Sequence, residues 1–94
     1  TEMAGTTLAT RKELAQFNIR RLGVDIEYHN RCIQESTAYL EEVILYEKTN
    51  GHLPGVIEGS QQLRGTIEKD IVNHTRLRDK AIGEQQRLLC RYGN

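Results

Sequence analysis

The chain has 94 residues, of which 28% are charged and 5% aromatic, with one proline and no tryptophan. Its thirteen basic side chains balance thirteen acidic ones, so the formal net charge of +0 argues against nucleic-acid binding by bulk electrostatics. A chain this short forms a single domain, residues 1–94. Its composition is typical of long exposed helices rather than of a compact α/β enzyme. No apolar run approaches the roughly twenty residues that span a membrane.

A seven-residue repeat predicts a first helix over about residues 7–49. Its first series is Ile19, Ile26, Ile33 and Leu40, and its second series, three residues later in each case, is Leu22, His29, Ser36 and Val43. Alternating steps of three and four residues form the seam of a helix that wraps another helix, with a left-handed supercoil. Gly23 could stop and restart this helix. We predict continuity, because Ile19 and Ile26 keep the same register across it.

The pair Asn50-Gly51 predicts the end of this helix, and Pro54 lies within a turn over residues 50–55. A second helix follows over about residues 56–92. Its predicted seam residues are Leu63, Ile67, Ile71, Leu77, Ala81 and Leu88. No alternating run of β-branched residues indicates a strand anywhere in the chain.

Two long helices joined by a short turn must fold back on each other, which predicts an all-α, coiled-coil-like, antiparallel hairpin. In such a hairpin, residue i lies beside about residue 106 − i. A second apolar line runs beside the first seam and comprises Phe17, Val24, Cys32, Tyr39, Ile44 and Tyr46. This wider apolar stripe predicts further helices. We expect either a homodimer that forms an elongated four-helix bundle or docking on the helices of another protein.

Folding back also separates the charges along the predicted rod. Residues 1–31 and 76–94 carry ten basic and six acidic side chains, a net +4, and residues 32–75 carry three basic and seven acidic ones, a net −4. The arginines that define the basic end are Arg20, Arg21, Arg76, Arg78 and Arg87. Such polarity favours antiparallel self-association or contact with an acidic partner. The alternative interpretation is a solvated surface with weak local ion pairs.

Three polar residues, His29, Ser36 and His74, fall on seam positions. They predict a buried polar layer that sets the register and oligomeric state. The register places Cys32 near His74, so these two residues and His29 could alternatively hold zinc. Because no H-x-x-x-H pair accompanies them, we predict the polar layer and no metal or cofactor. Two distant cysteines, Cys32 and Cys90, predict no internal disulfide and a reducing, cytoplasmic compartment.

No catalytic motif occurs in the sequence, so we expect a protein that is not an enzyme. The pattern predicts an interaction or assembly module that acts through coiled-coil packing, either as a scaffold subunit or as part of a larger assembly. One alternative is a small bundle that binds RNA or DNA through its basic end, although no stacking surface is evident. Another is an export or assembly chaperone whose apolar stripe covers a helical partner.

Overall fold

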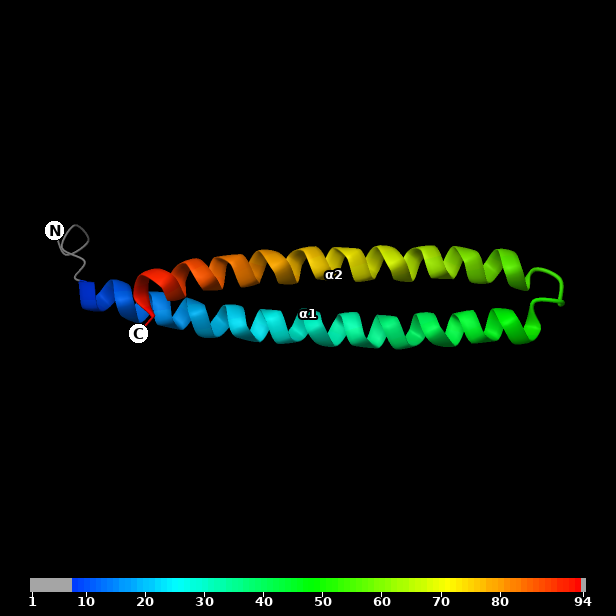
Figure 1. Ribbon diagram of the computed structural model, residues 1–94, viewed down its shortest axis with the longest axis horizontal. Coiled ribbons are helices and arrows are strands. Elements are labelled where there is room, and N and C mark those ends of the chain that lie inside the picture. Colours follow the sequence, from blue (N-terminus) through cyan, green and yellow to red (C-terminus); the bar gives the residue numbers. More distant parts are fainter. Residues whose placement is uncertain (1–7, 94) are drawn as a thin grey trace.

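Two long helices make up the protein, and the computed structural model describes residues 8–93 (Figure 1). Helix α1 spans Leu8–Asn50, 43 residues, and helix α2 spans Val56–Tyr92, 37 residues. They lie side by side and antiparallel, and no strand occurs within residues 8–93. The predicted all-α fold with two long helices is confirmed. The molecule measures 71 × 25 × 14 Å and is therefore a rod. Helix α1 continues through Gly23 without interruption.

The reversal of the chain between the helices uses one special backbone conformation. Gly55 caps α2 with φ 80°, a left-handed conformation that other residues rarely adopt. The turn is closed by backbone hydrogen bonds from the Leu53 N–H to the Asn50 carbonyl, 3.0 Å, and from the Val56 N–H to the Leu53 carbonyl, 3.3 Å. The Gly55 carbonyl then accepts the first helical bond, 3.0 Å, from the Gly59 N–H. This short, closed turn holds the two helices side by side.

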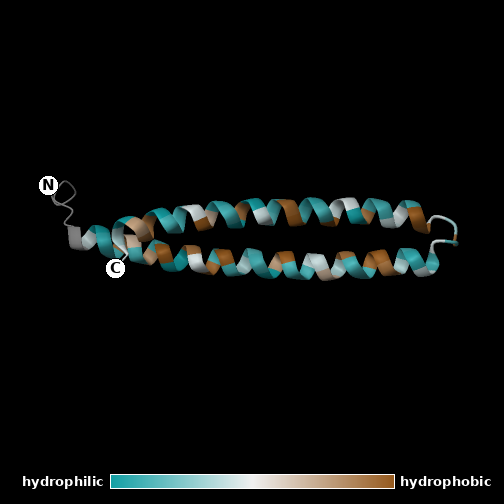
Figure 2. Ribbon diagram, viewed as in Figure 1, coloured by the Kyte–Doolittle hydropathy of each residue, from teal (hydrophilic) through white to brown (hydrophobic). Residues whose placement is uncertain are grey.

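One seam joins the helices. Its buried residues are Ala15, Leu22 and Val43 from α1, and Ser60, Ile67 and Ala81 from α2. Within each helix these residues keep multiples of the seven-residue spacing, which is expected when two helices stay in contact along their whole length. Three of the six are alanine or serine, and such small side chains allow close approach. Figure 2 shows that apolar and polar residues alternate along both helices, without a long apolar run.

The depth of burial differs between the two series predicted for α1. Leu22 and Val43, of the second series, are buried, whereas the whole first series is only half-buried: Ile19, Ile26, Ile33 and Leu40. On α2, Ile71, Leu77 and Leu88 are likewise half-buried. A two-helix rod has solvent on both flanks of its single seam, which explains this partial burial. No large side chain within residues 8–93 is fully buried.

Candidate functional site

A polar cluster occupies the middle of the seam. The Nδ1 atoms of His29 and His74 lie 2.9 Å apart in a hydrogen bond between the helices. The estimated register placed His74 near Cys32, with His29 about one turn away; the Ser36–Asp70 bond fits this register and the His29–His74 bond lies three residues from it. His74 meets His29 because the rotation of each helix, as well as its axial position, selects which side chains meet, and positions 29 and 74 both face the seam.

Asp70 connects this histidine pair to the next turn. Its Oδ2 accepts a 2.9 Å hydrogen bond from the Ser36 hydroxyl, and its Oδ1 lies 3.5 Å from His74 Nε2. Ser36, His74 and His29 are therefore linked through an aspartate that the sequence pattern did not single out. The cluster is half-buried rather than sealed from solvent, because the His74 side chain keeps 16% of its surface exposed.

Tyr28 closes one side of the cluster. Its ring makes edge contacts with His29, at 5.3 Å between centroids, and with His74, at 6.1 Å. A hydrogen bond with the Cys32 side chain and the negative charge of its thiolate raise the pKa of the Tyr28 phenol. Within residues 8–93, no three His, Cys, Asp or Glu side chains are grouped so that they could hold a metal ion. Two hydrogen bonds of this cluster, His29–His74 and Ser36–Asp70, join the two helices.

The arginines assigned to the basic end are partly engaged within the hairpin. Arg78 donates to Asn30 Oδ1 across the helices at 3.1 Å. Arg76 donates to Asn73 at 2.8 Å, and Arg21 forms an ion pair of 3.5 Å with Asp25. Arg20 and Arg87 are exposed.

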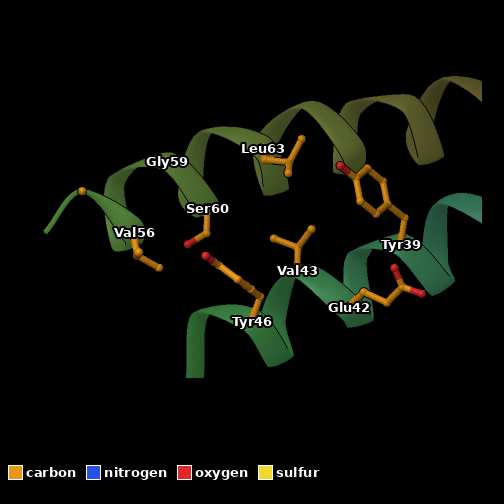
Figure 3. Close-up of a pocket in the computed structure, with 9 residues that line it drawn as sticks. Tyr39, Glu42, Val43, Tyr46, Val56, Gly59, Ser60 and Leu63 are labelled. Carbon is orange, nitrogen blue, oxygen red and sulfur yellow. The ribbon is translucent and has the colours of Figure 1, made fainter. Parts of the chain in front are cut away.

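A groove of about 440 Å³ lies between the helices near the turn. Figure 3 shows Tyr39, Val43 and Tyr46 rising from α1 toward α2, with Ser60 opposite. The lining residues are Tyr39, Glu42, Val43, Tyr46, Gly55, Val56, Gly59, Ser60 and Leu63. The groove exists because positions 55 and 59 lack side chains and position 60 carries a small one, while two tyrosines form the opposite wall.

Leu63 belongs to this groove rather than to the interior of the seam. It is 36% exposed, whereas Ile67, one turn later, is 5% exposed. Leu63 lies beside the line that joins Ser60 to Ile67, so its side chain reaches the edge of the contact. The tyrosines of the opposite wall are also accessible, with Tyr39 48% and Tyr46 56% exposed.

The two flanks of α1 differ in chemistry. One flank, which we call the groove flank, carries Tyr39 and Tyr46, and Tyr28 and Leu14 extend it toward the N-terminus. The other flank carries only exposed polar residues at seven-residue spacing: Arg20, Glu27, Gln34, Glu41 and Lys48. The sequence showed a second apolar line, but the side on which it lies depends on how α1 is rotated against α2.

Both cysteines are free: Cys32 is half-buried and Cys90 is exposed. Among the described helices, none has a stretch long and apolar enough to cross a bilayer. No protein family, no characterised protein and no solved structure matches this chain.

Proposed function

We propose that this protein is a non-enzymatic assembly module that acts by helix packing, and that two copies associate into an elongated, antiparallel four-helix bundle. The observation that carries the proposal is incomplete burial. Within residues 8–93 no large side chain is fully buried, while large apolar residues such as Phe17, Tyr39 and Leu45 remain at least 48% exposed. Large apolar side chains left exposed beside one thin seam favour burial against a partner.

The distribution of charge supports an antiparallel arrangement. The half of the rod that contains the turn carries a net −4, and the half that contains the termini carries a net +4. An antiparallel dimer sets each acidic half beside a basic half, whereas a parallel dimer sets like charges together. The same polarity favours a helical partner protein only if that partner carries a matching pattern.

Nucleic-acid binding receives less support. Three of the five arginines at the basic end, Arg21, Arg76 and Arg78, bond to groups within the hairpin. A nucleic-acid-binding protein would show a steep loss of affinity for RNA or DNA with added salt.

Sedimentation equilibrium over a concentration series tests the proposal directly. We expect the mass to rise from one chain to two, and to fall moderately when the series is repeated at high salt, because apolar burial persists while attraction between charged ends is screened. A mass equal to one chain at every concentration would contradict the proposed assembly function.

A further inference from the structure

We propose that the groove beside the turn is filled by Leu14 of a second copy of this chain. The inference rests on the proposed function, because it identifies the contact by which two copies pack. The groove takes apolar side chains: its walls are Tyr39, Tyr46 and Leu63, and Gly59 leaves its floor open.

The proposed occupant is an exposed apolar residue near the other end of α1. Leu14 is 58% exposed. It lies four seven-residue repeats before Glu42, which lines the groove, so Leu14 projects from the same side of α1 as the groove wall. The groove and Leu14 therefore lie on one face of the rod, near opposite ends.

The positions along the helix also match. Helix α1 spans Leu8–Asn50, so its midpoint is residue 29. Two α1 helices that pair antiparallel about this midpoint place Leu14 opposite about residue 44, a position between Tyr39 and Tyr46. One twofold dimer therefore fills two grooves with the same contact.

The surroundings of the two surfaces are complementary in charge. Exposed Glu42 lines the groove, and exposed Arg11 lies one helical turn before Leu14 on the same flank of α1. A second copy thus matches the groove in chemistry and position.

Two matched pairs of variants test this contact in the full chain, with sedimentation equilibrium as the measurement. Gly59→Leu fills the groove, and Gly65→Leu is its control, because a side chain at either glycine meets open space and Gly65 does not line the groove. Leu14→Ala removes the occupant. Leu89→Ala is its control, since Leu89 is 44% exposed near the same end of the rod but directly follows the seam residue Leu88, on the flank away from the groove.

We expect Gly59→Leu and Leu14→Ala each to raise the dimer dissociation constant about tenfold or more, and both controls to stay within about twofold of the parent. Far-ultraviolet circular dichroism verifies that all four variants remain helical. If the parent forms a dimer and either test variant has the same dissociation constant, the groove contact is wrong while the assembly function stands. A monomeric parent would overturn the assembly function as well.

Discussion

At the scale of single residues, the histidine pair is the most informative contact between the helices. A hydrogen bond between two Nδ1 atoms needs one ring to donate a proton and the other to accept it. His29 and His74 therefore depend on each other, and either ring alone would leave a half-buried polar atom without its partner. Such a layer costs stability compared with an apolar one but defines how the helices align.

A double-mutant cycle on this pair measures that dependence. We expect His29→Leu and His74→Leu each to raise the free energy of unfolding only slightly, because each leaves one imidazole unpaired between apolar groups. The double variant should be more stable than either single variant, with a coupling free energy of about 1 kcal/mol. Urea unfolding of the four proteins provides the free energies. Strictly additive effects would show that the two rings do not interact.

Tyr28 provides a prediction about pH. Its pKa is raised by the hydrogen bond with Cys32 and by the negative charge of the thiolate. The folded hairpin thus holds the phenol proton more tightly than the unfolded chain does. This contribution to stability is complete below about pH 10, the ordinary tyrosine value, and is lost as the pH rises through the raised pKa.

Absorbance titration of the phenolate tests this effect. We expect a late-titrating component in the parent that Tyr28→Phe removes and that Cys32→Ala shifts to lower pH. Persistence of the late component in Tyr28→Phe would assign it to another of the four tyrosines.

At the scale of the elements, the glycines of α2 have opposite roles. Gly55 begins the helix with φ 80°, which only glycine adopts without strain. Gly65 lies within the helix, where a side chain would meet open space, so it contributes flexibility without a structural need. Helix α2 is therefore intrinsically weaker than its length suggests, and packing against α1 stabilises it.

Alanine substitutions at these two positions should change stability in opposite directions. Gly65→Ala should raise the free energy of unfolding by about 1 kcal/mol through helix propensity. Gly55→Ala should lower it by about 1–2 kcal/mol, because alanine is strained in the left-handed region. The urea midpoint of each variant, compared at an unchanged slope, gives the values. Equal effects of the two substitutions would contradict the capping role of Gly55.

At the scale of the whole molecule, a 71 Å rod depends on one seam. Helices α1 and α2 pack only on each other within the described part of one molecule. A substitution that disrupts the seam therefore leaves no second core to stabilise them. The terminal half and the turn half also differ in charge, which makes the two ends of the rod chemically distinct. Both properties favour association of the chain over independent action.

A charge placed in the seam should therefore unfold the entire hairpin. Ile33→Asp should lower the free energy of unfolding by at least about 3 kcal/mol, because it removes an apolar side chain from the seam and places a carboxylate there. We expect loss of helical circular dichroism and of self-association. Gln34→Asp is the control, since Gln34 is exposed on the polar flank of α1. A variant Ile33→Asp as helical and as oligomeric as the parent would show that this seam does not hold the fold.

Much of the architecture can be read from local chemistry. The seven-residue repeats specify two long helices, and Asn50-Gly51 together with Pro54 specifies the reversal between them. The helices and the turn can be predicted because each depends on residues that lie within a few positions of one another in the sequence. The two series on α1 were likewise visible, although the pattern ranked the Ile19 series ahead of the more deeply buried Leu22 series.

The contacts between the helices required the three-dimensional structure. Which rings meet depends on the rotation and the axial position of α1 against α2 together, so an estimate from the turn alone gave the register to within about one helical turn but did not single out the His29–His74 bond. The groove is a property of both helices at once, since the tyrosines of α1 enclose space only where Gly55 and Gly59 of α2 leave it open. Local sequence sets what each helix can present, and packing selects which of those side chains meet.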